Sequence, residues 1–341
     1  MIAWGLLAVE RSQVDDLSIF NPAAPPAESI RTLSILTFAI TGAIFVLVEG
    51  ILIYNLLRFR RSAKAGQPVE SEPPQVYGGH PIEIAWTVAP TLVVCILVLV
   101  LSRTLWEVDV PAAPPEPGDH ALHVTVIGRQ WWWEYHYDTY NGRPLGFITA
   151  NELHVPATTD SAHRPVYLDL QSADVCHSFW VPRLAGKTDL IPGQTNHTWF
   201  ETHERGLFLG QCAEYCGTQH ASMLLRVVVD SPEEFEQWLK QQEQPAREEP
   251  SARAGKAAFL AEACVNCHRV RGTAAAGTYA PDLTHLMSRE TIAAGLIPNT
   301  EANLDRWVAD PQQLKYGCLM PAFSFSDARR NDIVRYLTTL Q

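Results

Sequence analysis

The chain has 341 residues, more than one hydrophobic core usually supports, so we expect two or more domains. Its 37 acidic side chains outnumber the 26 basic ones and give a net charge of −11. That balance argues against a nucleic-acid-binding protein and indicates a solvated acidic surface. The seven cysteines are unevenly spread: one lies in an apolar stretch, three near the middle of the chain and three near its end.

Two long apolar runs, residues 32–57 and 84–106, predict a membrane-spanning helical hairpin. Each exceeds the roughly 20 residues that a helix needs to cross a bilayer core. A basic cluster from Arg58 to Lys64 follows the first run, so the positive-inside rule places this connection in the cytoplasm. The chain on both sides of the hairpin, with both termini, is then expected outside the cytoplasm.

The N-terminal segment, residues 1–29, is mildly apolar and then rich in proline. Its apolar piece, Ile2–Val9, could be the remnant of a signal peptide, but it is short and lacks a positively charged start. The segment also lacks a cysteine placed for lipid attachment, so lipid anchoring is not supported.

Two carboxylates belong to the predicted hairpin region, residues 30–108. Glu49 stands nine residues before Arg58, about 13 Å into the bilayer at the rise of an α-helix. An ionisable group at that depth faces protein or extends to the interface, and both a functional and a structural role are open. Glu83 stands at the cytoplasmic start of the second run, where a surface carboxylate is unremarkable.

Residues 118–244 predict a small all-β sandwich or barrel followed by a helix. Strand patterns, either alternating or β-branched, occur at three places: 120–127, 165–170 and 224–229. Turn signals such as Asn141-Gly142 lie between them, and the helical period is missing. A capping signal at Ser231 opens the trailing helix.

One short stretch near the end of this region concentrates metal-binding side chains. Cys212, Cys216, His220 and Met223 follow one another at spacings of four, four and three. Thiolates and a thioether are soft donors and imidazole is intermediate, so the set suits copper. His177 lies upstream and is placed to supply a second imidazole. We therefore predict a copper electron-transfer centre, with His177 on a separate loop at the same end of the domain.

The same residues are also compatible with three alternatives. A shared helix face would bring them together, but Gly210 and Gly217 bracket the cysteines and favour a loop. A disulfide between the two cysteines would leave His220 and Met223 without a role. Zinc held tetrahedrally by the two thiols and the two histidines is the strongest competitor, and the weak thioether argues against it.

The last third of the chain predicts a second soluble domain, residues 252–341, after a polar linker at 245–251. Helical patterns occur in three stretches of this domain: 255–263, 300–308 and 326–340.

Cys264, Cys267 and His268 form a C-x-x-C-H motif at the start of this domain. Two thiols at this spacing attach a haem covalently, and the adjacent histidine becomes an axial ligand. Met320, followed by a proline, is the expected second axial ligand, and a Met/His pair raises the haem potential. A redox-active C-x-x-C pair is the alternative, but it needs neither His268 nor the downstream methionine.

Two further residues of this domain are alternatives to Met320, and one cysteine lies outside the C-x-x-C-H motif. His285 and Met287 are alternative sixth ligands, although local packing accounts for their stretch better. Cys318 is expected to be a free, partly buried thiol.

With these residues in view, the chain resembles subunit II of haem-copper cytochrome c oxidases, of the caa type that carries a fused C-terminal cytochrome c. The resemblance covers nearly all of the chain from about Ile30 onward. It rests on the C-x-E-x-C-G-x-x-H-x-x-M loop, the C-x-x-C-H motif and the late Met-Pro pair. It implies a two-helix transmembrane hairpin, an all-β cupredoxin-like Greek-key domain and an all-α class I cytochrome c domain.

The resemblance also assigns roles to individual residues. It implies a binuclear copper centre, CuA, in which both thiolates bridge two coppers, with these side-chain ligands: His177, Cys212, Cys216, His220 and Met223. Glu214 would give its backbone carbonyl to one copper and its carboxylate to a magnesium ion at the boundary with subunit I. Trp131 matches the electron-entry residue, whereas core packing accounts for Trp133. Glu83 matches the carboxylate at the mouth of a proton pathway into subunit I.

Two positions beside the expected ligands complete the comparison with the family. Pro281 matches the proline that packs near the axial His268. Cys176 stands directly before His177, where an aliphatic residue is usual, and core packing is the simplest reason for it.

The implied function is that of an electron-carrying subunit in a bacterial inner membrane. An external donor, a cytochrome c or a bc complex, would reduce the haem, and electrons would pass through CuA to haem a of subunit I. Subunit I would reduce O2 at haem a3 and CuB, coupled to proton translocation, and subunit III and lipid would be further partners. The alternatives are the CuA subunit of a nitric oxide reductase and a membrane-anchored copper or redox sensor.

Overall fold

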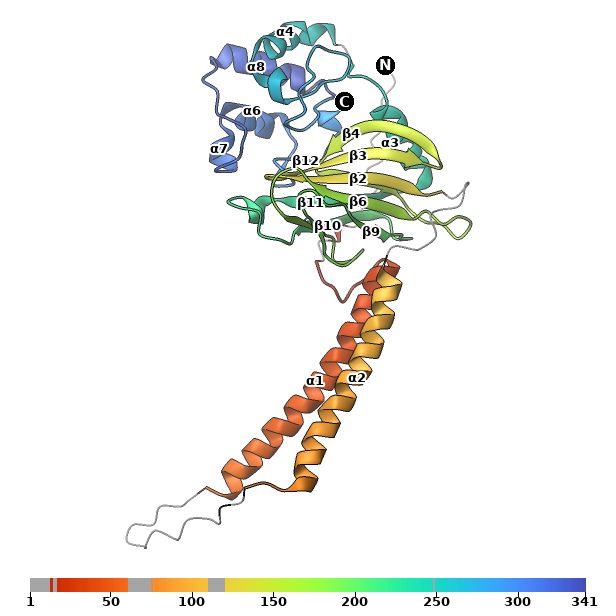
Figure 1. Ribbon diagram of the computed structural model, residues 1–341. Helices are drawn as coiled ribbons and strands as arrows, with labels where there is room; N and C mark the ends of the chain where they lie inside the picture. The colour runs from red at the N-terminus through yellow and green to blue at the C-terminus, as the bar shows by residue number, and fades with distance from the viewer. Residues whose placement is uncertain (1–12, 15–16, 61–74, 76, 110–119, 248) are drawn as a thin grey trace, which may run out of the picture. The chain divides into compact units, whose positions relative to one another are not determined.

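The computed structural model describes residues 13–14, 17–60, 75, 77–109, 120–247 and 249–341 (Figure 1). These form two compact units: residues 29–108, and the chain before and after them. The segments outside the described residues include the possible signal-peptide remnant Ile2–Val9, the part of the basic cluster that follows Arg60, and the proline-rich stretch 111–118.

The first unit is a pair of long helices, α1 (Pro25–Arg58) and α2 (His80–Val108). In both helices the most apolar 18-residue window contains no buried residue, and each helix is long enough to cross a membrane. Hydroxyl groups within these helices donate hydrogen bonds to carbonyls one turn earlier in the same helix; for example, Thr37 Oγ1 donates to the Leu33 carbonyl at 2.9 Å. This arrangement leaves few polar groups facing a lipid phase.

Both helices extend beyond the predicted runs 32–57 and 84–106. The largest difference is at the N-terminus, where α1 begins at Pro25, inside the segment 1–29 that was expected to precede the hairpin. Proline is tolerated in the first turn of a helix because its missing N–H has no partner there anyway. The end of α2 contacts the start of α1, because Ser29 Oγ donates a hydrogen bond to Glu107 Oε2 at 3.0 Å.

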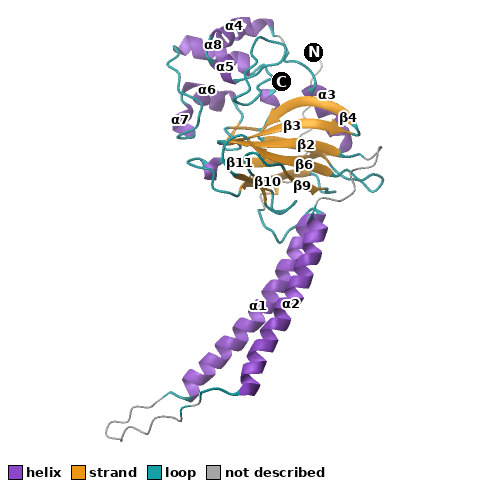
Figure 2. Ribbon diagram, viewed as in Figure 1, coloured by secondary structure: helices purple, strands orange, loops and turns teal. Residues whose placement is uncertain are grey.

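The second unit contains a β-sandwich, as the alternating patterns predict (Figure 2). One sheet has the order β4-β3-β2-β6-β9, formed in that order by Arg143–Ala150, Trp132–Tyr140, Leu122–Arg129, Val166–Ser172 and Asn196–Phe200. The other has the order β5-β11-β10-β7-β8, formed by Glu152–Pro156, Leu224–Asp230, Gly206–Cys212, His177–Trp180 and Thr188–Leu190. A short strand that the sequence pattern did not predict, β1 (Gln13–Val14), pairs in parallel with β10.

Strand alternation places one face of each sheet in a shared core. Strand β2 buries every second side chain, beginning at Leu122, as a half-buried strand should. Residues of both sheets belong to a single buried cluster, whose largest members include Trp133, Tyr135 and Phe208. The predicted turn at Asn141-Gly142 joins β3 to β4 with positive φ angles of 52° and 70°, which asparagine and glycine tolerate.

Helix α3 (Pro232–Gln242) follows the sandwich and confirms the predicted trailing helix. Ser231 accepts a hydrogen bond from the Glu234 backbone N–H, and the Glu234 side chain returns to the Ser231 backbone, which is a complete capping box. Trp238 then stacks on His154 at 4.5 Å between ring centroids and ties the helix to the sheet.

The C-terminal region is helical, as predicted. Its α-helices are α4 (Arg253–Ala261), α5 (Cys264–Cys267), α6 (Glu301–Ala309), α7 (Pro311–Leu314) and α8 (Asp327–Leu337). It also contains the hairpin of β12 (Thr291–Ile292) and β13 (Ile297–Pro298), and the 3₁₀ turns η2 (Pro250–Ala252) and η3 (Leu286–Ser288). Gly255 lets α4 and α8 approach closely, because a Cβ there would lie 2.0 Å from the Asp332 carbonyl oxygen.

The predicted linker, residues 245–251, does not separate the two soluble regions in the structure. The Ala246 N–H donates to the Arg271 carbonyl at 3.1 Å, and the Arg271 guanidinium donates to the Gln242 carbonyl. A Cβ on Gly272 would lie 3.0 Å from Pro245. The described part of this stretch therefore packs on the helical region, and both regions belong to one compact unit.

Candidate functional site

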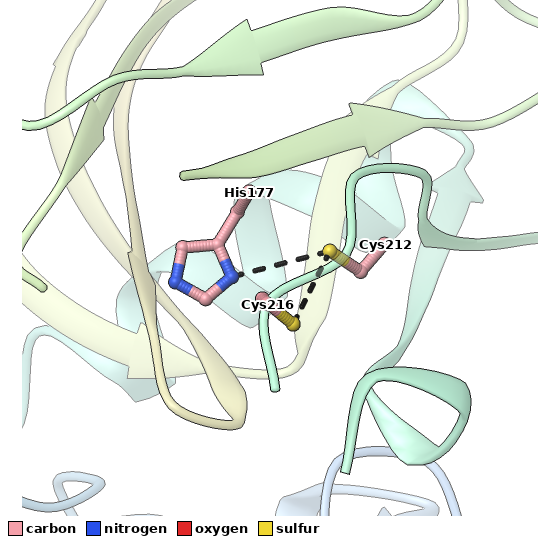
Figure 3. A group of neighbouring side chains, drawn as sticks. All are labelled: His177, Cys212 and Cys216. Carbon is pink, nitrogen blue, oxygen red and sulfur yellow. Dashed lines mark hydrogen bonds between the residues drawn. The ribbon is translucent and has the colours of Figure 1, made fainter. Parts of the chain in front are cut away.

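His177, Cys212 and Cys216 come together in the core of the β-sandwich (Figure 3). Their ligand atoms lie within 4.8 Å of one another, and all three residues are buried. The distances are 3.9 Å from His177 Nδ1 to Cys212 Sγ and 3.7 Å between the two sulfurs. Two thiols and an imidazole nitrogen around one point can hold a soft or intermediate metal ion.

The remaining predicted ligands surround the same point. His220 Nδ1 lies 3.6 Å and Met223 Sδ 3.8 Å from Cys216 Sγ, and Met223 is fully buried. The 3₁₀ turn η1 (His220–Ser222) sets this spacing, because the Met223 N–H donates to the His220 carbonyl. The Glu214 carbonyl oxygen lies 3.2 Å from Cys212 Sγ, while its side chain is exposed.

Two expectations about the elements that carry these ligands were wrong. His177 was expected on a loop, but it is the first residue of strand β7. Gly210 was interpreted as a loop residue, but it lies within strand β10, which continues to Cys212. Glycine is required there for close packing, since a Cβ would lie 2.4 Å from the Trp180 carbonyl oxygen. Gly217, with φ of 114°, does make the turn that the sequence predicted.

Two residues that the sequence pattern did not single out hold the His177 ring. Asp174 Oδ1 lies 2.8 Å from His177 Nε2, which leaves Nδ1 directed at the sulfurs. Gly128 lies against the same ring, and a Cβ there would be 2.8 Å from His177 Cδ2. The signal for Asp174 was present, because a carboxylate three residues before a candidate ligand histidine can orient it. Gly128 comes from a distant strand, and the sequence carries no comparable signal for it.

The electrostatics of the buried cluster favour a deprotonated thiol. The hydrogen bond between the sulfurs lowers the pKa of Cys212 to about 3, helped by His177, and raises the pKa of Cys216. Burial opposes a charge on His177, but hydrogen bonds with Asp174 and Cys212 outweigh it and raise its pKa. A thiolate is the form that binds metals, so the cluster is prepared for one.

A second site lies in the helical region, where a cavity of about 320 Å³ is lined by Cys264, Cys267, His268 and Met320. His268 Nδ1 donates to the Pro281 carbonyl at 2.8 Å, which confirms that this proline lies beside the histidine and leaves Nε2 free to bind a metal. Burial lowers the pKa of His268, which keeps the ring neutral, as a metal ligand must be.

The positions of Met320 and its competitors favour the predicted assignment. Gln312 Nε2 donates to the Met320 and Cys318 carbonyls, each at 2.9 Å, and so holds the loop that carries the thioether. His285 and Met287 are not among the residues that line the cavity. His285 Nε2 instead contacts the Gln244 carbonyl at 3.0 Å, in agreement with local packing.

Trp131 connects the two sites. It lines the cavity of the helical region, and its Nε1 donates to the Cys216 carbonyl at 2.9 Å. Gln130, a further residue that the sequence pattern did not single out, lines the same cavity and donates to the same carbonyl at 2.8 Å. Trp133 is fully buried in the sandwich core, which confirms its predicted packing role.

Comparisons with known proteins identify the family to which each region of the chain is similar. The family model for the periplasmic domain of cytochrome c oxidase subunit II matches residues 122–231, that for its transmembrane domain matches residues 13–103, and that for cytochrome c matches residues 252–341. Cytochrome c oxidase subunit 2 of Alkalihalophilus pseudofirmus is 34% identical over 332 residues, which cover 96% of this chain and 92% of that relative.

Cytochrome c oxidase subunit 2 of Bacillus subtilis is 33% identical over 343 residues, which cover 95% of this chain and 92% of that relative. The chain belongs to the cytochrome c oxidase subunit II family. The crystallised periplasmic domain of subunit II of cytochrome oxidase from Bradyrhizobium japonicum is 31% identical, with a TM-score of 0.32, over 36% of this chain and 92% of that one.

Membership in the subunit II family confirms the predicted fold class of two apolar helices, a cupredoxin-like sandwich and a helical cytochrome c domain. It also establishes the chain as the electron-transfer subunit of an oxidoreductase complex that works with subunit I. The cupredoxin-like domain implies CuA copper, and the cytochrome c domain implies a haem c. The donor sets described above fit both groups.

We expect Asp174→Asn to weaken copper binding by about 10- to 100-fold, because an amide holds the His177 ring less firmly than a carboxylate does. Competitive copper titration of the purified protein measures this directly.

Asp169→Asn provides the matched control, because Asp169 Oδ1 forms the same kind of contact with the exposed His197 at 2.7 Å. Equal copper affinities in the two variants would show that Asp174 does not orient the ligand.

Proposed function

We propose that this subunit takes electrons from an external donor at a covalent c-type haem and delivers them, through a binuclear copper centre, to haem a of subunit I. The reduction of O2 to water in subunit I would be coupled to proton translocation. The observation that carries this proposal is the position of Trp131, whose side chain touches both the cavity of the helical domain and the backbone of the metal loop.

The haem-holding residues are proposed to be Cys264, Cys267, His268 and Met320. The two thiols would form thioether bonds, and His268 Nε2 and Met320 Sδ would be the axial ligands. Support comes from the cavity that these residues line and from the Pro281 carbonyl that fixes the His268 ring. When bound, the haem supplies an iron that gains and loses one electron at a time.

The copper-holding side chains are proposed to be His177, Cys212, Cys216, His220 and Met223, with the Glu214 carbonyl as a further donor. Five soft or intermediate side-chain donors exceed what one tetrahedral zinc requires, and the buried Met223 favours copper. Together these donors would hold two coppers, which would accept and pass on one electron as a unit. The exposed Glu214 carboxylate would be available to a magnesium ion at the boundary with subunit I.

The membrane topology is proposed from the chain order. Two spans return the chain to the side on which it began, and Arg58 at the end of α1, with the basic residues that follow it, favours the cytoplasm for the connection. The cupredoxin-like domain (118–244), the linker (245–251) and the cytochrome c domain (252–341) would then lie on the extracytoplasmic side of a bacterial inner membrane. Subunit III, lipid, and a cytochrome c or bc complex as donor are the further partners proposed.

Glu83 is proposed as the entrance of a proton path into subunit I. Its Oε1 accepts a hydrogen bond from the Gly79 backbone N–H at 3.2 Å, and its side chain remains 44% exposed, so it can exchange protons with water.

The cofactor assignment is tested by expressing the full chain with its partner subunits and measuring metal content and electron paramagnetic resonance. In addition to the haems and the copper of subunit I, we expect one covalent haem and two coppers that share one unpaired electron. One zinc in place of the coppers, or a mononuclear copper signal, would contradict the proposal.

Met320→Ala should leave the haem covalently attached, because Cys264 and Cys267 are intact, but should lower its reduction potential through loss of the thioether ligand. Redox titration of the haem absorbance in the purified complex measures this. Met287→Ala is the control, and an unchanged potential in Met320→Ala would refute the axial assignment.

Glu83→Gln should slow oxygen consumption by the assembled oxidase while reduction of the copper centre proceeds at its normal rate. Glu107→Gln, at the opposite end of α2, is the control that should retain full turnover. Equal turnover in both variants would remove Glu83 from the proton path.

A further inference from the structure

Lys315 is a lysine of the cytochrome c domain that is buried against the cupredoxin-like domain. It follows helix α7, is only 4% exposed, and has an ammonium group with three N–H donors. Each donor has a backbone carbonyl partner: Trp131 at 2.8 Å, Ser222 at 2.8 Å and Ala293 at 3.1 Å. Within the described residues no carboxylate forms an ion pair with it, so carbonyl dipoles balance the buried charge.

The three carbonyls belong to three different parts of the electron-transfer region. Trp131 lines the haem cavity and contacts the copper loop through its indole. Ser222 directly precedes the copper ligand Met223 and ends the turn η1. Ala293 lies in the tip of the β12–β13 hairpin, which also lines the haem cavity. One side chain therefore joins the cavity wall, the copper loop and the haem domain.

The hairpin that presents the Ala293 carbonyl is held in a costly conformation. Ala293, Ala294 and Gly295 have φ angles of 58°, 63° and 82°, and alanine rarely adopts this left-handed region. The tip is packed tightly, since a Cβ on Gly295 would lie 3.0 Å from Leu224, the residue after Met223. A conformation of this kind persists only where its surroundings enforce it, and Lys315 is one of the groups that do so.

A second buried charge anchors the base of the same hairpin without touching the copper loop. Glu152 of strand β5 is 2% exposed and accepts hydrogen bonds from the backbone N–H groups of Glu290 at 2.9 Å and Thr291 at 2.8 Å. Lys315 and Glu152 thus both hold the cytochrome c domain against the cupredoxin-like domain, but of the two only Lys315 contacts Trp131 and the residue before Met223. A variant of Glu152 therefore loosens the contact between the domains, whereas a variant of Lys315 also affects the residues beside the copper site.

We propose that Lys315 is a positioning residue for electron transfer between the haem and copper sites, which fixes the Trp131 backbone and the Met223 end of the copper loop relative to the haem cavity. The proposal rests on the function proposed above. Burial lowers the pKa of Lys315 to about 8, so the group remains mainly a cation at neutral pH and keeps all three donors.

The test uses the complete oxidase with Lys315→Gln, which removes the charge and shortens the side chain. The optical and electron paramagnetic resonance spectra of the copper centre, and the rate of haem-to-copper transfer after photochemical reduction of the haem, are measured. Because the rate of electron transfer falls as the distance between donor and acceptor grows, we expect the transfer to slow severalfold. The copper spectra should shift, because loss of the hydrogen bond to the Ser222 carbonyl displaces the adjacent Met223.

Two controls separate positioning from general effects. Lys240→Gln removes a lysine that is exposed on helix α3 and should match the unmodified protein. Glu152→Gln weakens the hairpin base and should leave the copper spectra unchanged.

Unchanged spectra and transfer rate in Lys315→Gln, or equal spectral shifts in Glu152→Gln, would overturn the proposal. If Lys315→Gln does not bind both cofactors, Lys315→Met, which places an apolar side chain in the buried position, is measured instead. Failure of both Lys315 variants to bind the cofactors would also overturn it, because positioning is not needed for loading. Absence of copper or haem from the unmodified protein would instead refute the proposed function.

Discussion

The backbone carbonyl of Cys216 is the point where the metal loop meets the wall of the haem cavity. Trp131 Nε1 and Gln130 Nε2 both donate to it, at 2.9 and 2.8 Å, from a strand connection of the opposite sheet. Each such hydrogen bond adds only about 1 kcal/mol to stability, whereas a buried carbonyl left without a donor costs about 1–3 kcal/mol. The value of this pair is mainly geometric, because it fixes the indole between two sites that must exchange electrons.

The surrounding fold supplies the rigidity that this contact requires. Cys212 ends strand β10 and His177 begins strand β7, and the two strands pair with each other next to the metal cluster. Ligands set on paired strands move less than ligands on free loops, so their geometry changes little when an electron arrives. Buried polar contacts hold the fused cytochrome c domain against the cupredoxin-like domain. The described part of the linker packs on the cytochrome c domain.

Much of this arrangement could be predicted from local patterns. The spacing of Cys212, Cys216, His220 and Met223 predicted the cluster, because one turn and one short 3₁₀ segment bring those positions together. The apolar runs predicted α1 and α2, and the capping signal at Ser231 predicted α3. The start of α1 at Pro25 was missed, because proline is usually interpreted as a helix breaker and is tolerated only in the first turn.

What could not be predicted depends on contacts between distant segments. Gly128 and Gly210 look like ordinary flexible glycines, and only the folded sheets show that His177 and the Trp180 carbonyl leave no room for a side chain. The burial of Lys315 is equally invisible in the sequence, since its three carbonyl partners come from separate parts of the chain. The resemblance to the oxidase family named the proposed ligands but not these supporting groups.

The central claim is that electrons pass from the haem site to the copper site within one chain. The most direct measurement injects one electron photochemically into the haem of the fully oxidised complex and follows both chromophores at several protein concentrations. The account predicts that the haem is reoxidised at the same rate as the copper is reduced, and that this rate does not depend on concentration. A rate that rises in proportion to concentration, or copper reduced before the haem, would contradict it.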